Sequence, residues 1–423
     1  MEQISFFDGS NRLRIDKPIR LIELFAGYGS QALALKYLGV SFEHYRICEW
    51  AVKSIQAYKD MHFPDDDTDY SRKPTREEVE NFLSKWGISA DYNVPMTKEQ
   101  IKRMGEKKQR QVYNNIIATH NLVSVCNCKA SDLGIESTDR YTYIMTYSFP
   151  CQDLSLAGKQ AGMERGGDTR SGLLWEVERL LLEMKEKPQI LVMENVPNVI
   201  GARNIQHFAE WLKSLENMGY KCYWKCLNAK DYGVPQSRNR CFMVSVLGDA
   251  YYEFPKKFPL EKCLKDVLEE RVSDKYFLSD KMIECMIKHD GERAKKRYSK
   301  VFVPIDTNGV SRCLMTTGGR RPEDNYIKVM GNIPSAREHT GRVYGDDGIS
   351  PTLTAVCGGE QQPYIEVGDK VRRLTPREYF RLMGVKDEDF DRVAINQSDT
   401  SLYHLAGDSI VVNVLMQIFN KML

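Results

Sequence analysis

The chain has 423 residues, of which 28% are charged and 42% hydrophobic, and its formal net charge is +2. This size predicts a globular protein of two or three domains, and the balance of charge excludes a polyanion-binding protein that works through its overall field. The longest apolar runs are shorter than the ~18 residues of a membrane span, and the N-terminus shows no secretory signal pattern. The absence of a secretory signal, together with the odd number of 11 cysteines, predicts free thiols in a reducing, cytoplasmic compartment. The short apolar runs predict no membrane partner.

The first 250 residues alternate between strand and helix patterns. An apolar strand at 21–25, a helix at 31–38 and a strand at 42–48 form one βαβ unit. A polar stretch at 64–120 then interrupts the pattern. The alternation predicts an α/β fold with a mostly parallel sheet covered by helices on both faces. The other expected strands are 141–147, 189–193, 220–227 and 241–246, the expected helices of the main pattern are 173–184 and 205–218, and those of the interruption are 75–85 and 97–120.

The pattern changes after about residue 250. Two loosely similar segments, 311–329 and 350–367, each contain a Gly-Gly pair followed by Tyr-Ile, which predicts hairpin-like pieces of a second, strand-rich domain. The last stretch, 409–423, has the pattern of an amphipathic helix that packs back on the first domain.

A glycine-rich segment leaves the first strand and enters the first helix. Residues 23–32, ELFAGYGSQA, fit the pattern G-x-G-x-x-A, and Glu49 ends the next strand 20 residues after Gly29. Glycines let a ligand approach the backbone, and an acidic residue at this spacing accepts hydrogen bonds from ribose hydroxyls. A nucleoside-containing cofactor is therefore predicted, either NAD or S-adenosylmethionine, although a tight turn without a ligand also explains the glycines.

A cysteine follows the strand at 141–147. Pro150 ends this strand, and Cys151 begins a stretch rich in Gly, Ser and charge that runs to Gly172 and is typical of a movable loop. Taken alone, Cys151 is as well explained by a buried structural thiol. The pairs Cys126-x-Cys128 and Cys222-x3-Cys226 lack second pairs at zinc-finger spacing, so no metal site is expected.

Two further polar groups follow later strands. Glu194 and Asn195 come directly after the apolar strand at 189–193, at the sheet edge where open α/β sheets bind ligands, although a helix cap would also explain them. Arg238 and Arg240 are two residues apart beside a strand, so we expect both guanidinium groups on one face, holding a phosphate or a base carbonyl.

These parts suit one reaction. Carbon 5 of cytosine is too weak a nucleophile to accept a methyl group, but thiolate addition to carbon 6 makes it an enamine carbon that can attack. A carboxyl group hydrogen-bonded to N3 relieves the charge that this addition creates. A cysteine, a glutamate and a methyl donor are sufficient for this chemistry.

The ordered motifs FAGYGS, EW, SDL, FPCQ, RSGLL, ENV, QSRNR, RRLTPRE and GDS resemble those of the DNA cytosine-5 methyltransferases. The resemblance implies a Rossmann-like, S-adenosylmethionine-dependent methyltransferase domain and a smaller strand-rich target-recognition domain. On this basis residues 1–250, with the helical insertion at 64–120 and the C-terminal helix 405–423, form the catalytic domain, and 251–404 form the recognition domain and hinge. The recognition residues that it implies are Arg312, Arg320, Arg321, Arg337 and Arg342.

The resemblance also implies residue roles. Cys151 would be the nucleophile on a cytosine flipped out of the duplex, with Glu194 activating the ring at N3. Pro150 would shape the nucleophile turn, and the loop 151–172 would close over DNA. Asn195 would support Glu194, Arg240 would contact the base, and Gln236 and Arg238 would brace the site. The cofactor residues would be Phe25, Ala26, Gly27, Tyr28, Gly29, Glu49, Trp50, Asp132, Leu133, Leu173, Asp408 and Ser409.

The chain departs from the family pattern in two places. Asp408 replaces a usual Asn in Gly-Asn-Ser, which puts one cofactor contact in doubt, and Ser148 replaces a frequent glycine, a change expected to have no consequence. The insertion and the loop 162–166 are similar to those of the bacterial CpG-methylating subgroup.

The expected partner is double-stranded DNA, bound by a monomer, with a cognate restriction endonuclease as a genetic partner. The alternatives are an RNA (tRNA) cytosine-5 methyltransferase, a nicotinamide-dependent oxidoreductase and a catalytically silent DNA-binding relative. The oxidoreductase leaves FPCQ and ENV without a role, and the silent relative is disfavoured because Cys151 and Glu194 are both present. The long recognition segment favours duplex DNA over RNA.

Overall fold

The structure is a computed structural model, and it describes residues 11–150, 154, 163–166, 170–276, 329–332, 342–345, 350, 364–367 and 370–423. The chain divides into two compact units. The first unit comprises Met1–Leu227, Arg240–Lys256 and Leu415–Leu423, and the second comprises Asn228–Asn239 and Lys257–Val414.

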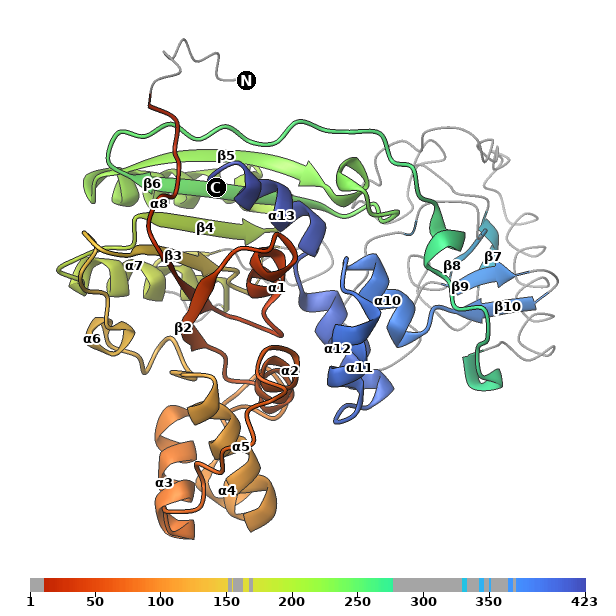
Figure 1. Cartoon of the computed structure of the whole chain (residues 1–423), viewed down its shortest axis with the longest axis horizontal. Helices are drawn as coiled ribbons and strands as arrows, with labels where there is room; N and C mark the ends of the chain where they lie inside the picture. Colours follow the sequence, from red (N-terminus) through yellow and green to blue (C-terminus); the bar gives the residue numbers. More distant parts are fainter. Residues whose placement is uncertain are drawn as a thin grey trace. The chain divides into compact units, whose positions relative to one another are not determined.

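A six-stranded sheet with the order β2-β1-β3-β4-β6-β5 forms the centre of the first unit (Figure 1). β1 pairs in parallel with both β2 and β3, β3 pairs in parallel with β4, and β4 pairs antiparallel with β6. The predicted α/β fold with a mostly parallel sheet is confirmed. The strands are β1 (Ile19–Leu24), β2 (Phe42–Cys48), β3 (Thr142–Tyr147), β4 (Ile190–Asn195), β5 (Tyr220–Asn228) and β6 (Asn239–Leu247).

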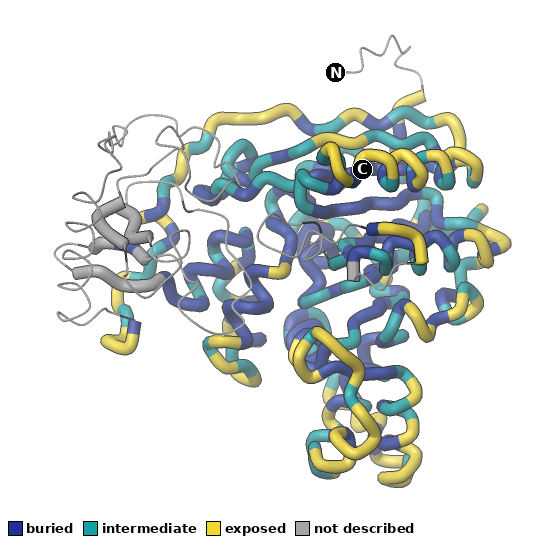
Figure 2. The backbone as a smooth tube through the Cα atoms, turned by 180° about the vertical axis from the view of Figure 1, so that it is seen from behind, coloured by how far each residue is buried: buried dark blue, intermediate teal, exposed yellow. Residues whose placement is uncertain are grey.

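The strands form because buried β-branched and aromatic side chains follow one another, and every residue of β3 and β4 is buried. One face of these strands packs in a single cluster with α7 (Leu174–Glu183) and α8 (Ile205–Asn217), whose apolar residues recur at helical spacing. In Figure 2 these central strands are mostly dark blue. The core therefore fixes the strand ends that carry the site.

The other helices of the main pattern follow the glycine turn and β2. α1 (Ser30–Tyr37) is buried from Ser30 to Leu35, α2 (Val52–His62) follows β2, and the one-turn α6 (Ala130–Leu133) ends at Gly134. Leu415–Leu423 belongs to the first unit, where Tyr252 donates a hydrogen bond to the carbonyl of Ile418.

The predicted insertion forms a helical lobe, drawn in orange at the bottom of Figure 1. Its helices are α3 (Arg76–Trp86), α4 (Lys98–Arg103) and α5 (Glu106–Ala118). The single helix expected over 97–120 is wrong, because Gly105 adopts φ 82° and separates α4 from α5. Capping boxes start α3 at Thr75 and α4 at Thr97.

The second unit contains helices and a four-stranded sheet of order β10-β9-β8-β7. β7 and β8, and β9 and β10, pair antiparallel, whereas β8 and β9 pair in parallel. The Gly-Gly pairs of the expected hairpins lie outside the described residues. The elements are η4 (Ala229–Tyr232), η5 (Leu264–Val267), η6 (Asp274–Tyr276), β7 (Val329–Asn332), β8 (Arg342–Gly345), β9 (Tyr364–Val367), β10 (Lys370–Arg373), α10 (Pro376–Leu382), α11 (Asp387–Ala394) and α12 (Asp399–Asp408).

The C-terminal helix expected over 409–423 is α13 (Val412–Asn420), and it follows α12 closely. Among the described residues, the stretch Asp399–Asn420 alone is long and apolar enough to cross a membrane, but 72% of its most apolar window is buried inside the protein. Such burial is typical of a core helix.

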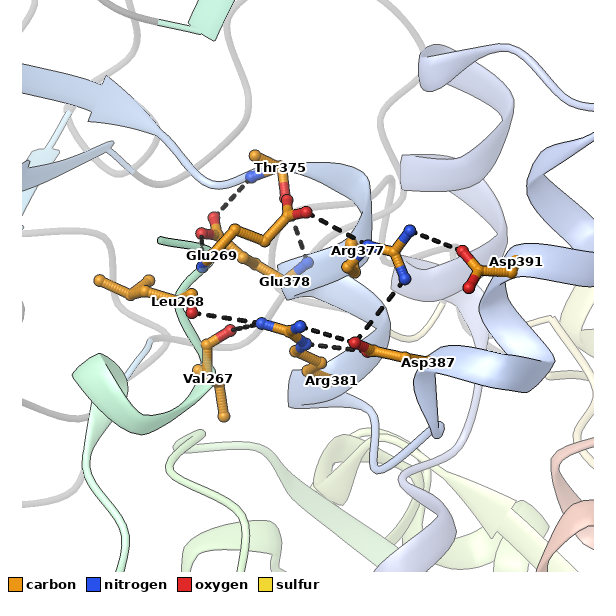
Figure 3. Close-up of polar contacts among 9 residues, drawn as sticks. All are labelled: Val267, Leu268, Glu269, Thr375, Arg377, Glu378, Arg381, Asp387 and Asp391. Carbon is orange, nitrogen blue, oxygen red and sulfur yellow. Dashed lines mark hydrogen bonds and ion pairs between the residues drawn. The ribbon is translucent and has the colours of Figure 1, made fainter. Parts of the chain in front are cut away.

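A polar network in the second unit ties the chain just after η5 to α10 and α11 (Figure 3). Arg381 donates to the carbonyls of Val267 and Leu268 at 3.0 and 3.2 Å and to both oxygens of Asp387 at 2.9 and 2.6 Å. Thr375 caps α10 in a capping box. The network therefore joins residues 267–269 to residues 375–391, which are more than a hundred residues away in sequence. Its remaining members are Glu269, Arg377, Glu378 and Asp391.

Candidate active site

The predicted site residues of the first unit follow strands that end in register. Leu24, the last residue of β1, pairs with Cys48 of β2 and with Tyr147 of β3, and Tyr147 pairs with Met193 of β4. The carboxyl ends of these strands therefore share one edge of the sheet, the usual ligand edge of an open α/β sheet. The residues placed at this edge are Phe25, Glu49, Ser148 and Glu194.

The glycine turn between β1 and α1 needs its two glycines for different reasons. Gly29 has φ +83°, and a Cβ there would lie 2.3 Å from His62 Nε2 and 2.6 Å from Tyr58 Cε2. Gly27 has φ +57°, but a Cβ there would meet nothing within 4 Å. Gly29 thus permits close packing behind the turn, whereas open space lies beside Gly27, as a cofactor cradle requires. Phe25 also has a positive φ, of 59°.

Glu49 connects the end of β2 to the glycine turn. Its side chain is buried, with Oε2 accepting from the Gly27 amide at 2.8 Å and Oε1 from the Ala51 amide at 2.7 Å. A carboxylate oxygen has more than one lone pair, so these bonds orient the group and leave acceptor capacity for ribose hydroxyls. The chemistry of the turn and of Glu49 therefore fits a nucleoside cofactor.

The other predicted cofactor residues of the first unit lie in the glycine turn, directly after β2, in α6 and in the short 3₁₀ helix before α7. Ala26 and Tyr28 are buried, so only their backbone suits ligand contact, and Trp50 is partly buried beside the insertion core. Asp132 and Leu133 lie in α6, which Arg46 of β2 joins by donating to the Asp132 carbonyl at 3.3 Å. Leu173 ends a short 3₁₀ helix.

Sequence reasoning missed Glu23, a fully buried carboxyl group in β1. Tyr58 donates to its Oε2 at 2.5 Å and the Ala32 amide to its Oε1 at 3.3 Å. Burial raises the pKa of Glu23 to about 7, against the smaller lowering effect of these hydrogen bonds. The signal in the sequence was Glu23 itself, a carboxyl group within the mostly apolar strand sequence IRLIEL.

Three side chains fix the backbone around the predicted nucleophile. Cys151 itself lies outside the described residues. Asn195 Nδ2 donates to the Phe149 carbonyl at 3.0 Å, and Ser171 Oγ to the Pro150 carbonyl at 2.8 Å. On the other side, Asn198 Nδ2 donates to the Leu154 carbonyl at 2.5 Å. The backbone is thus anchored at Phe149 and Pro150 before position 151 and at Leu154 after it.

Glu194 is oriented through both carboxylate oxygens. Ser148 Oγ donates to Oε2 at 2.5 Å, and Arg240 Nε lies 3.2 Å from Oε1. The expectation that Ser148 has no consequence is therefore wrong. Asn195 was expected to support Glu194, but its side chain instead bonds the Phe149 carbonyl and the Val196 amide.

Part of the predicted loop is anchored to α7. Trp175 Nε1 donates to the Met163 carbonyl at 3.0 Å, and Arg165 pairs with Glu178 while its guanidinium carbon lies 4.1 Å from the centre of the Trp175 ring. Closure of this loop over DNA stays a prediction.

Gln236, Arg238, Asp408 and Ser409 belong to the second unit. Gln236 Nε2 donates to the Leu382 carbonyl at 2.7 Å, and Arg238 Nη2 to the carbonyls of Gly407 and Ser409 at 2.9 and 2.7 Å. Asp408 Oδ2 lies 3.3 Å from His404 Nδ1. The hydrogen bonds of Gln236 and Arg238, the two predicted bracing residues, therefore hold segments of the second unit together. Arg238 is buried, so the expectation that it joins Arg240 in holding a phosphate or a base is wrong.

The predicted recognition arginines are not placed. Arg312, Arg320, Arg321 and Arg337 lie outside the described residues, and Arg342 is described only as the first backbone position of β8. No cluster of three or more potential metal ligands occurs among the described residues.

The mostly parallel sheet, the glycine turn after β1 and the glutamates at the strand ends place the chain in the class of Rossmann-like α/β proteins with an edge suited to a nucleoside cofactor. The family model of the C-5 cytosine-specific DNA methylases matches residues 93–423. The chain belongs to this family, and it is a DNA cytosine-5 methyltransferase. Membership implies the use of S-adenosylmethionine.

Named relatives span most of the chain. It is 32% identical to the type II methyltransferase M2.ScrFI of Lactococcus lactis subsp. cremoris, over 96% of this chain and 99% of that protein. It is 31% identical to the orphan methyltransferase M.SssI of Spiroplasma monobiae, over 96% of this chain and 97% of that protein. These matches favour DNA over the nicotinamide and RNA alternatives.

Solved structures support the fold. The Entamoeba histolytica methyltransferase EhMeth aligns with a TM-score of 0.55 and 15% identity, covering 96% of this chain and 98% of that one. A putative DNA modification methyltransferase encoded within an Escherichia coli prophage aligns with a TM-score of 0.51 and 15% identity, covering 96% and 98%. At this identity the likeness concerns the fold alone.

Proposed function

We propose that this chain methylates carbon 5 of cytosine at specific sites in duplex DNA, with Cys151 as nucleophile and Glu194 as the ring-activating carboxyl. The observation that carries the proposal is the orientation of Glu194 by Ser148 and Arg240 beside the anchored turn that leads to Cys151. A buried carboxyl group with both oxygens held is preorganised for a planar base.

The proposed reaction has three steps on a base flipped out of the duplex. The Cys151 thiolate adds to carbon 6 while Glu194 hydrogen-bonds N3 and supplies the proton that neutralises the ring. Carbon 5 then takes the methyl group. Loss of the carbon 5 proton to solvent water reforms the double bond and expels the thiolate, and N3 returns its proton to Glu194. When bound, S-adenosylmethionine would supply an electrophilic methyl group and would leave as S-adenosylhomocysteine.

The cofactor would lie beside the glycine turn. Phe25 would stack on the adenine, Glu49 and Trp50 would contact ribose and adenine, and the open side of Gly27 would admit the ligand. In this proposal the first unit is the catalytic domain and the second carries target recognition.

The partners of the enzyme also remain proposals. We expect a monomer on DNA. A cognate restriction endonuclease stays a prediction, since one relative is named a type II methyltransferase and another an orphan.

The test is covalent trapping on duplex DNA that carries 5-fluorocytosine at its cytosines, since fluorine replaces the proton that must leave. The wild-type protein should form a covalent complex in the presence of cofactor, and Cys151→Ser should not. Glu194→Gln should lower the methylation rate by about 10²–10⁴-fold. Cys126→Ser is the matched control, because Cys126 is exposed and outside the proposed site.

A covalent complex between Cys151→Ser and the DNA would contradict the assignment of Cys151 as nucleophile. The absence of a covalent complex with the wild-type protein, on DNA that it methylates, would contradict it as well. Bisulfite sequencing of DNA from expressing cells would report the methylated site. A preference for tRNA over duplex DNA in a competition assay would contradict the substrate assignment.

A further inference from the structure

The helical insertion and the residue that follows it are hydrogen-bonded to the backbone of Glu49 and Trp50, two of the predicted cofactor residues. Two points of the chain, one in the insertion and one directly after it, pair with the end of β2 and with the residues that follow β2. Ser89, which follows α3, forms a parallel bridge with Ala51, and Asn121, which follows α5, forms one with Ile47. The segment between these bridges contains Glu49 and Trp50.

Asn121 satisfies both main-chain polar groups of Glu49 with one side chain. Its Oδ1 accepts from the Glu49 amide at 3.0 Å, and its Nδ2 donates to the Glu49 carbonyl at 2.8 Å. The same Oδ1 accepts from the Val123 amide at 2.8 Å. Asn121 is buried, so water cannot easily replace these hydrogen bonds.

Ser89 holds the next residues in the same way. Its amide donates to the Trp50 carbonyl at 2.8 Å, and its carbonyl accepts from the Val52 amide at 2.9 Å. Its own hydroxyl donates to the Val94 carbonyl at 2.8 Å, which ties this point to the rest of the insertion.

The Trp50 side chain completes the connection through packing. Trp50 packs on a buried cluster built mainly from the insertion and α2, together with Phe82 and Trp86 of α3. The cluster consists of Val52, Ile55, Val79, Leu83, Ile88, Ile101, Val112, Ile116 and Val123. The position of the Trp50 ring therefore depends on the core of the insertion.

These contacts form a continuous path from the insertion to the glycine turn. Asn121 fixes the Glu49 backbone, and the Glu49 carboxylate in turn accepts from the Gly27 amide. We propose that the insertion is a structural wall of the cofactor pocket and that Asn121 is a positioning residue for Glu49. This inference rests on the proposed cofactor role of Glu49 and Trp50.

The test compares Asn121→Ala with Asn127→Ala in the full-length protein. Asn127 also holds the insertion, by donating to the carbonyls of Lys85 and Trp86 at 3.3 Å, but no described contact joins it to Glu49. Asn121→Ala should weaken S-adenosylhomocysteine binding in calorimetry by roughly tenfold, since two buried groups of Glu49 lose their partner. Asn127→Ala should bind it like the wild type.

Kinetics separate positioning from a general loss of structure. Asn121→Ala should raise KM for S-adenosylmethionine by a similar factor, while kcat at saturating cofactor and DNA affinity without cofactor change less than about twofold. Unchanged cofactor affinity in Asn121→Ala, or an equal loss in Asn127→Ala, would overturn the inference.

Hydrogen exchange of the wild-type protein keeps the inference testable if Asn121→Ala does not fold. S-adenosylhomocysteine should slow amide exchange in peptides that cover 86–92 and 119–124, and unchanged exchange in both would overturn it. Glu49→Ala distinguishes the two proposals. Wild-type cofactor affinity in Glu49→Ala would contradict the proposed cofactor site, whereas a loss in Glu49→Ala without one in Asn121→Ala would contradict the insertion's role alone.

Discussion

Alanine at the two glycines of the turn between β1 and α1, where the cofactor is proposed to bind, should separate packing from ligand binding. Gly29→Ala places a Cβ 2.3 Å from His62 Nε2 and 2.6 Å from Tyr58 Cε2, at a φ of +83°. Neither neighbour moves easily, because Tyr58 is hydrogen-bonded to Glu23 and His62 to the Tyr28 carbonyl. Left-handed strain costs about 1–2 kcal/mol and overpacking about 1–3 kcal/mol, so the expected loss is about 2–5 kcal/mol.

Gly27→Ala should behave differently. It incurs the strain of a φ of +57°, but its Cβ meets nothing within 4 Å, so the expected loss of stability is about 1–2 kcal/mol. The new methyl group would instead occupy the open side of the turn, where the cofactor is proposed to lie. Gly27→Ala should therefore weaken S-adenosylhomocysteine binding by about tenfold or more.

The assay is urea unfolding of the cofactor-free proteins, followed by calorimetry with S-adenosylhomocysteine. Gly29→Ala should be the less stable variant, and Gly27→Ala should lose more affinity than its stability loss explains. Equal stability of the two variants would refute the packing argument. Wild-type affinity in Gly27→Ala would refute the placement of the cofactor beside that residue.

Two further changes test buried and clustered charges. Because the folded pKa of Glu23 is raised to about 7, its contribution to stability is full below about pH 4.5 and is lost as the pH rises through 7. Glu23→Gln should flatten the pH dependence of the unfolding free energy by up to roughly 3 kcal/mol between pH 4.5 and 8, and an unchanged slope would contradict the buried titration. Arg381→Ala leaves the carbonyls of Val267 and Leu268 and the carboxylate of Asp387 without this donor, and should cost about 1–2 kcal/mol in urea unfolding. Arg381 lowers the pKa of Asp387, so the part of the stability difference that comes from this ion pair is lost as the pH falls through that pKa, while the part that comes from the two carbonyls persists. A stability difference that does not shrink in strong acid would contradict the ion pair.

The sequence predicted the sheet and the edge that carries the site, because strand patterns and motif order are local features. It did not predict why Gly29 is glycine, since Tyr58 and His62 come about thirty residues later and only the fold brings them behind the turn. The break between α4 and α5 was readable in principle, because Gly105 interrupts an otherwise helical pattern.

Arg238 shows how a period argument fails at an element boundary. Alternation places residues two apart on one face only inside a strand, and β6 begins at Asn239. Arg238 therefore precedes the strand and turns to the carbonyls of Gly407 and Ser409, while Arg240 reaches Glu194. The strand predicted at 241–246 begins two residues earlier, so it includes Arg240 but not Arg238.

The two glutamates of the site are held in different ways, and this has a consequence for variation. Glu49 accepts hydrogen bonds from the main-chain amides of Gly27 and Ala51, whereas Glu194 contacts the side chains of Ser148 and Arg240. Main-chain donors persist through most substitutions as long as the turn keeps its shape, but a side-chain donor is lost with one substitution. Orientation of the Glu49 carboxylate, proposed to bind the cofactor, should therefore depend mainly on the backbone framework, including the insertion. Orientation of the Glu194 carboxyl, proposed to be catalytic, should depend on the identity of two side chains.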